Sequence, residues 1–101
     1  MDNRNDSLTH HQLSLKINYQ ESLQIIDISE DLDLADLPYP NVLHVPASKL
    51  LELTDQIQQD IPVILVDKDE RRSRKLCTLL NEEYGFGNIY YLTEVPAGAD
   101  H

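Results

Sequence analysis

Short runs of apolar residues, several of them rich in β-branched side chains, are the strongest pattern in this chain. A continuous apolar run of about four to eight residues is typical of a strand buried on both faces of a sheet. The clearest run is Val63–Val66 (VILV), in which three of the four side chains are β-branched. We expect four strands, at residues 23–28, 42–45, 63–66 and 88–92.

Apolar residues at spacings of three and four predict helices between these strands. Residues 47–57 show this spacing, with Ser48 as a candidate N-cap. Residues 73–84 show it most clearly, and Gly85 is placed to end that helix as a C-cap. The apolar faces consist of Leu50, Leu53 and Ile57 in the first helix and of Leu76, Cys77, Leu80 and Tyr84 in the second.

The two ends of the chain differ from this pattern. Residues 1–7 contain one apolar residue and should form a disordered tail, and residues 94–101 should form a second tail. A short helix, capped by Ser7 or Thr9, is expected next, with Leu8 among its apolar residues. A chain of 101 residues is enough for one modest core, so we expect a single domain over residues 8–93. Alternating strands and helices indicate an α/β class with a largely parallel sheet.

Charge and composition narrow the classes of function. Eight Lys and Arg face eighteen Asp and Glu, and the formal net charge is −10. This charge disfavours a site for DNA or RNA phosphates and disfavours an anionic membrane surface. No apolar run approaches the ~20 residues that span a bilayer, and the polar N-terminus does not resemble a secretory signal. A single cysteine, Cys77, excludes an internal disulfide, so we expect a reducing, cytoplasmic location.

The buried strand Val63–Val66 runs into a polar segment, residues 67–73 (DKDERRS), that leads to the longest predicted helix. A strand, a tight loop and a helix N-terminus form the usual geometry of an anion or nucleophile site. The candidate binding loop consists of Asp67, Lys68, Asp69, Glu70, Arg71, Arg72 and Ser73. Its carboxylates would repel an anion by about 1–4 kcal/mol per close pair of charges.

The simplest interpretation of this loop is structural. Asp67, Asp69 and Glu70 would cap the helix and face the solvent, and the two arginines would pair with Asp69 and Glu70. A retained ligand pocket with altered chemistry is the functional alternative.

Four segments, in this order, resemble the single-domain rhodanese family. They are LQIIDISE (residues 23–30), YPNVLHVP (39–46), PVILVDKDERRS (62–73) and YGFGNIYYL (84–92). The third is similar to the family's proline, four apolar residues, cysteine and short loop ending in Arg-Ser. The resemblance covers about residues 9–92. It implies a rhodanese-like α/β fold, with a central, largely parallel sheet of four to five strands flanked by helices on both faces.

The resemblance also implies a chemistry, from which this chain departs. The family carries sulfur as a persulfide on a cysteine that begins a six-residue loop, whose backbone N–H groups stabilise the thiolate or an oxyanion. Here Asp67 stands at the nucleophile position, and a carboxylate cannot form a persulfide. Ser29 replaces an arginine of the family, and the Gly-Gly-Ile-x-x-Trp ending is missing after Leu92. The resemblance therefore implies a non-catalytic binding or regulatory module without a cofactor.

A partner follows from the same resemblance. The Tyr-Gly-Phe segment at residues 84–86 is similar to rhodanese-like domains at the C-terminus of adenylyltransferases that activate sulfur-carrier proteins. This implies a protein partner, such as an adenylyltransferase or a sulfur-carrier protein, in sulfur transfer of the molybdopterin or thiamine type. We expect no nucleic-acid partner and no membrane partner.

Enzymatic alternatives remain open. A divergent enzyme could use the Asp67 loop, either as a relic sulfurtransferase or as a Mg²⁺-dependent hydrolase. The segment VILVDKDE resembles the first motif of haloacid-dehalogenase-type phosphatases, in which the first Asp is the nucleophile. The later motifs of that family are missing. Cys77 is a further candidate nucleophile, but its place on the apolar face of a helix predicts a small buried hydrophobe.

Metal binding has little support in the sequence. The acidic cluster of Glu30, Asp31, Asp33 and Asp36 lacks the glycine and the spacing of an EF-hand loop. The four histidines lack the spacing of a zinc site; they are His10, His11, His44 and His101. We therefore predict no metal site.

Overall fold

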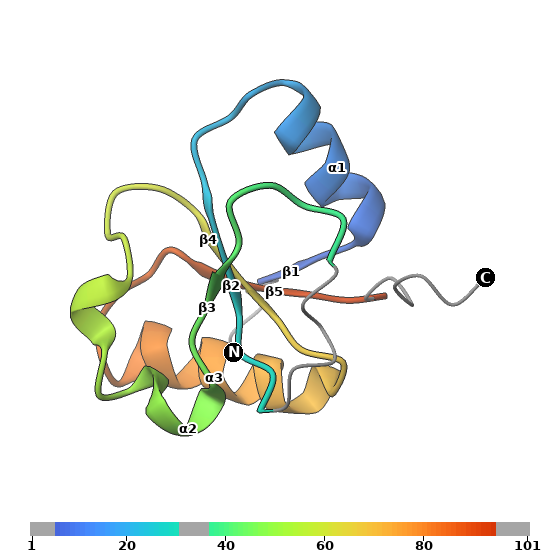
Figure 1. The fold of residues 1–101 in the computed structure, drawn as a ribbon. Helices are drawn as coiled ribbons and strands as arrows, with labels where there is room; N and C mark the ends of the chain where they lie inside the picture. Colours follow the sequence, from blue (N-terminus) through green and yellow to red (C-terminus); the bar gives the residue numbers. More distant parts are fainter. Residues whose placement is uncertain (1–5, 31–36, 95–101) are drawn as a thin grey trace, which may run out of the picture.

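Five parallel strands form a single sheet in a computed structural model that describes residues 6–30 and 37–94 (Figure 1). Along the sheet the strands follow the order β1-β5-β4-β2-β3. They are β1 (Ser7–Leu8), β2 (Gln24–Asp27), β3 (Leu43–His44), β4 (Val63–Val66) and β5 (Ile89–Leu92). The predicted α/β class and parallel sheet are confirmed.

Helices cover both faces of this sheet (Figure 1). They are α1 (His10–Asn18), α2 (Ala47–Leu50), the 3₁₀ turn η2 (Thr54–Gln56) and α3 (Glu70–Glu82). Leu13 of α1 is buried on one face, and Leu50 of α2 and Leu80 of α3 are buried on the other. None of the helices in the described part of the chain has the length and apolar character that a membrane span needs.

The strand β4 lies at the centre of the core because its side chains contribute alternately to both faces. Val63 and Leu65 belong to the cluster under α2 and α3, whereas Ile64 and Val66 belong to the cluster under α1. All four side chains are completely buried. A strand that is covered on both faces needs apolar residues at every position, which explains the unbroken VILV run.

The N-terminal segment contains a strand that the sequence analysis missed. Ser7 and Leu8 pair with Tyr91 and Leu92 of β5, so Leu8 belongs to a strand and not to the predicted helix. A two-residue strand has no periodic pattern that could reveal it. Thr9 caps α1, as predicted, through a capping box with Gln12. The remaining residues of the predicted tails, 1–5 and 95–101, lie outside the described residues.

The single helix predicted over residues 47–57 is wrong. The helix α2 ends at Leu50, and Pro46, not Ser48, occupies its N-cap position. The side chain of Gln24 bonds the carbonyl of Gln56 at 3.0 Å and the N–H of Gln58 at 2.9 Å. These long-range bonds tie residues 56–58 to the start of β2, so tertiary contacts override the local helical spacing.

The C-terminal end of α3 places β5. Gly85 has a φ of 75° in the left-handed region, and the N–H of Phe86 donates to the carbonyl of Leu80 at 3.1 Å. The side-chain amide of Asn81 bonds both the N–H and the carbonyl of Ile89, at 3.1 and 3.0 Å. Tyr84, predicted on the apolar face, follows the helix and is 47% exposed, so that part of the prediction is wrong.

Candidate functional site

The carboxyl ends of two neighbouring strands bring two aspartates to one edge of the sheet. Asp27, the last residue of β2, pairs with Val66, the last residue of β4, and Asp67 follows directly. Both aspartates are buried, Asp67 completely. In open parallel sheets this edge is where ligands bind, so it is the candidate site of this fold.

Both carboxylate oxygens of Asp67 are bound by the protein itself. Oδ1 accepts the backbone N–H of Asp69 at 3.0 Å and an Nη2–H of Arg72 at 3.1 Å. Oδ2 accepts the Nε–H of Arg72. The guanidinium therefore holds the carboxylate in a two-point ion pair, which is the strong geometry for Arg and Asp.

Arg72 lies at the boundary between the buried aspartate and the solvent. Its side chain is 39% exposed, whereas that of Asp67 is fully buried. The hydrogen bond to Asp67 raises the pKa of Arg72 above its ordinary value, and the charges of Asp67, Asp69 and Glu30 act in the same direction. The guanidinium is therefore a permanent cation that compensates the buried carboxylate.

Only one of the two predicted arginine pairs is present as expected. The Nε of Arg71 lies 3.8 Å from Oδ1 of Asp69, and the two side chains are 84% and 46% exposed. Arg72 pairs with Asp67 and not with Asp69 or Glu70, so that expectation is wrong. The helix begins early enough to bring residue 72 back over the end of β4, which linear spacing does not indicate.

The helix α3 begins three residues earlier than predicted. Asp69 is its N-cap, and its side chain accepts the N–H of Arg71 at 3.1 Å. The predicted capping role of Asp69 is confirmed, but the connection between β4 and α3 is only residues 67–69. The charged residues 70–72 have no apolar periodicity, so the sequence pattern did not include them in the helix.

The other members of the predicted loop separate into two groups. Lys68 and Glu70 are exposed, and Glu70 lies in the first turn of α3. Ser73, predicted to open the helix, is buried inside it, and its Oγ–H donates to the carbonyl of Glu70 at 2.9 Å. The structure thus gathers Asp67, Asp69 and Arg72 at the end of β4, whereas Lys68, Glu70 and Arg71 face the solvent and Ser73 is buried within α3.

At the end of β2 an aspartate accepts the N–H two residues later, as at the end of β4, and the sequence pattern did not predict this turn. Oδ1 of Asp27 accepts the N–H of Ser29 at 2.9 Å, as Oδ1 of Asp67 accepts the N–H two residues later. Glu30 then bonds the N–H and the hydroxyl of Ser48 at 2.6 and 3.1 Å. An aspartate that ends a strand two residues before a serine is the signal that could have revealed this turn. Asp31, Asp33 and Asp36 lie outside the described residues.

Cys77 is placed as a core residue. Its side chain is 1% exposed, and the thiol donates to the carbonyl of Ile89 in β5 at 3.2 Å. It packs in the apolar cluster between α3 and the sheet. The prediction that Cys77 is a small buried hydrophobe is confirmed.

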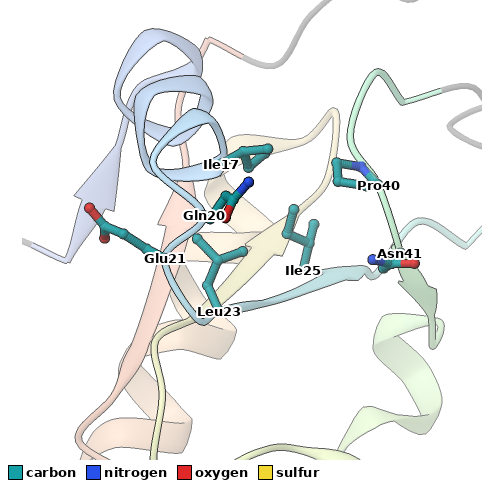
Figure 2. Close-up of a pocket in the computed structure, with 7 residues that line it drawn as sticks. All are labelled: Ile17, Gln20, Glu21, Leu23, Ile25, Pro40 and Asn41. Atoms are coloured by element: carbon teal, nitrogen blue, oxygen red, sulfur yellow. The ribbon is translucent and has the colours of Figure 1, made fainter.

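Two of the hollows in the described surface are relevant to what it can hold. One, of about 450 Å³, lies at the start of α3 and is lined by Asp69, Arg71, Arg72 and Lys75. The other is smaller, about 180 Å³, and lies near the amino ends of β2 and β3 (Figure 2). Figure 2 shows apolar side chains from Ile17, Leu23 and Ile25 in this second hollow, with Glu21 turned away. Within residues 6–30 and 37–94, no three His, Cys, Asp or Glu side chains are grouped so as to hold a metal ion.

The fold is that of rhodanese-like proteins, and three solved structures share it. A rhodanese-related protein from Thermoplasma volcanium has a TM-score of 0.71 and 21% identity, covering 85% of this chain and 81% of that chain. A rhodanese-like domain protein from Staphylococcus aureus has a TM-score of 0.66 and 21% identity, covering 86% and 81%. A protein from Staphylococcus saprophyticus subsp. saprophyticus has a TM-score of 0.70 and 19% identity, covering 94% and 90%.

Sequence comparison finds similarity to a bacterial protein. The chain is 27% identical over 77 residues to the protein named "Putative sulfurtransferase YtwF" of Bacillus subtilis (strain 168), covering 76% of this chain and 74% of that protein. No family model matches the chain. The comparisons therefore show a rhodanese-like fold and a sequence similarity to a protein named as a putative sulfurtransferase.

Proposed function

We propose that this chain is a non-catalytic rhodanese-like domain that serves as a binding or regulatory module in a sulfur-transfer system. One observation carries the proposal. Asp67 stands where the resemblance places the sulfur-accepting cysteine, and Arg72 donates to both of its carboxylate oxygens while the N–H of Asp69 donates to one of them.

The chemistry of persulfide transfer requires a thiolate at this position. A thiolate attacks the sulfur donor, keeps the transferred sulfur as a persulfide and passes it to an acceptor. The carboxylate of Asp67 cannot form that bond. It is also completely buried and compensated by Arg72, so a substrate would have to displace the arginine to reach it.

The surroundings of Asp67 also oppose the binding of an anionic sulfur donor. The N–H groups of Asp69 and Arg71 already donate to carboxylates of the protein. Acidic groups at the start of α3 compensate the helix dipole by about 0.3–1 kcal/mol each, so less of it remains for a ligand. An incoming anion would also meet Asp69 and Glu70, at about 1–4 kcal/mol for each close pair of charges.

Cys77 offers no replacement nucleophile. Its thiol is buried and bonded to the carbonyl of Ile89, and reactive thiols need access and a stabilised thiolate. A phosphatase-like role for Asp67 meets a similar obstacle. The carboxylate oxygens that would attack phosphate or bind Mg²⁺ are held by Arg72.

A thiosulfate:cyanide sulfurtransferase assay tests the proposal. We expect the wild-type protein to form no more thiocyanate than the Cys77→Ala variant and a reaction without protein. Turnover that disappears in Cys77→Ala would identify Cys77 as the nucleophile and overturn the proposal. Turnover that persists in Cys77→Ala would overturn it as well. Mg²⁺-dependent phosphatase activity that is lost in Asp67→Asn would establish the hydrolase alternative instead.

For the partner, we propose an adenylyltransferase or a sulfur-carrier protein in the cytoplasm, from the resemblance of the segment around Tyr84 and Phe86. The test is size-exclusion chromatography of the chain mixed with a purified sulfur-carrier protein and, separately, with its adenylyltransferase. Co-elution with either supports the proposal, and separate elution from both contradicts it.

A further inference from the structure

The positive charges of this acidic chain are concentrated in one short segment. Five of its eight Lys and Arg lie within residues 68–75, although the formal net charge of the chain is −10. This segment comprises the end of the β4–α3 connection and the first turns of α3. Arg72 is used internally, because it compensates Asp67.

Three of the remaining cations form what we call the cationic face of α3, defined as Arg71, Arg74 and Lys75. Residues separated by three and four positions are neighbours on a helix surface, so these three side chains lie together. All three are exposed, and the side chain of Arg71 is 84% exposed. Within the described chain, neither Arg74 nor Lys75 forms an ion pair.

The folding of the domain does not explain this arrangement. Like charges at these spacings repel one another, and cations near a helix N-terminus oppose the helix dipole. The buried face of α3 is formed by Ser73, Cys77 and Leu80, so the three cations make no contribution to the core. Of these three cations only Arg71 has a carboxylate partner among the described residues, Asp69 at 3.8 Å, so Arg74 and Lys75 are available for binding.

A surface hollow adjoins the cationic face. It has a volume of about 450 Å³, and its lining includes Arg71 and Lys75. Asp69 and Arg72 complete the lining, so one carboxylate lies among the cations of the hollow. A small free anion in the hollow would meet that carboxylate, whereas acidic side chains on a larger partner can also contact Arg74, which is exposed and does not line the hollow.

We propose that the cationic face of α3 docks an acidic segment of a partner protein. The inference rests on the proposed function and names the surface and the chemistry of its partner. From Arg71 to Lys75 the face extends about 6 Å along the helix axis, at about 1.5 Å per residue. A short acidic segment fits this length. A long polyanion would extend beyond the face and come within the Debye length of about 8 Å of acidic parts of the protein, which would repel it.

Fluorescence anisotropy with a labelled hexaglutamate peptide, at an ionic strength of about 0.15 M, tests this surface. The variant Arg74→Gln/Lys75→Gln removes two charges from the face, and Lys16→Gln/Lys49→Gln removes two charges elsewhere on the described surface. We expect the first variant to bind the peptide roughly three- to tenfold more weakly than wild type, as two exposed charge contacts imply. The control should bind within about twofold of wild type, since general charge effects are screened.

The other outcomes overturn the inference. Equal weakening in both variants would show a general charge effect, and absence of binding by wild type would show that the face does not accept carboxylates. Tighter binding of a six-residue oligothymidylate than of the peptide would assign the face to nucleic acid. Reversal by millimolar sulfate at constant ionic strength would assign it to small anions. The sulfurtransferase assay is independent: turnover by wild type would overturn the proposed function, whatever the peptide titration shows.

Discussion

Replacement of Arg72 by methionine should destabilise this domain far more than loss of an ordinary surface ion pair. The substitution keeps most of the side-chain length and leaves the buried carboxylate of Asp67 without its cation. Breaking a buried ion pair in this way costs about 3–5 kcal/mol. Arg72 is 39% exposed and Asp67 retains the N–H of Asp69, so we expect a smaller loss of about 2–3 kcal/mol in the free energy of unfolding.

Urea denaturation monitored by circular dichroism measures this loss, and the neighbouring arginine supplies a matched control. Arg71 is on the same helical turn, and its pairing with Asp69 is exposed. We expect Arg71→Met to change the free energy of unfolding by less than about 0.5 kcal/mol. A thermal scan should show Arg72→Met melting roughly 10–20 °C lower than wild type, from about 4–8 °C per kcal/mol.

A double-mutant cycle shows whether the loss comes from the pair itself. Asp67→Asn should cost about 1–2 kcal/mol because its amide leaves a buried donor near Arg72. The double variant Asp67→Asn/Arg72→Met should cost at least ~1 kcal/mol less than the sum of the two single variants. If Arg72→Met costs no more than Arg71→Met, the carboxylate of Asp67 is not buried as described, and the argument for its structural role fails.

Three further predictions concern other parts of the fold. Burial raises the pKa of Tyr39 from 10.0 to about 12, so the free energy of unfolding should fall as the pH rises through that interval. Tyr39→Phe should remove this pH dependence. If the variant shows the same pH dependence as wild type, the prediction is contradicted. Cys77 should react with a thiol reagent such as Ellman's reagent only as the protein opens, so a labelling rate equal to that of unfolded protein would refute its placement. Gly85→Ala should lower the free energy of unfolding by about 1–2 kcal/mol because φ is 75° there, and Gly87, with φ 77°, provides a comparison at a second left-handed position.

Strong local patterns in the sequence predicted the central part of the fold. The four apolar runs correspond to β2, β3, β4 and β5, and the helix over residues 73–84 corresponds to most of α3. These elements have patterns because each one buries at least one face. The elements that were missed or misplaced depend on contacts distant in sequence. β1 exists through its pairing with β5, and α2 is short because Gln24 holds residues 56–58.

In the candidate site, too, the features with a local sequence pattern were predictable and those that depend on the folded geometry were not. Its position was predictable, because a buried strand followed by a polar loop and a helix indicates the carboxyl end of a parallel strand, where ligands bind in such sheets. The partner of Asp67 was not predictable, since Arg71 and Arg72 are both within reach in sequence and only the start of α3 decides between them. Asp27 was not predicted, although the serine two residues after it is a local signal for the turn that its carboxylate forms.

The order of strands in the sheet has a consequence for folding during synthesis, in which the N-terminal part of a chain is made first. β4 can pair with β2 as soon as it is synthesised. Its other edge stays unpaired until β5, near residue 90, has been synthesised. Until then the most apolar strand of the protein presents unpaired N–H and carbonyl groups, which is the condition that favours aggregation. Asn81, which binds both backbone groups of Ile89, helps to bring β5 to that edge. Variants of Asn81 should therefore reduce the yield of soluble protein by more than their effect on native stability implies.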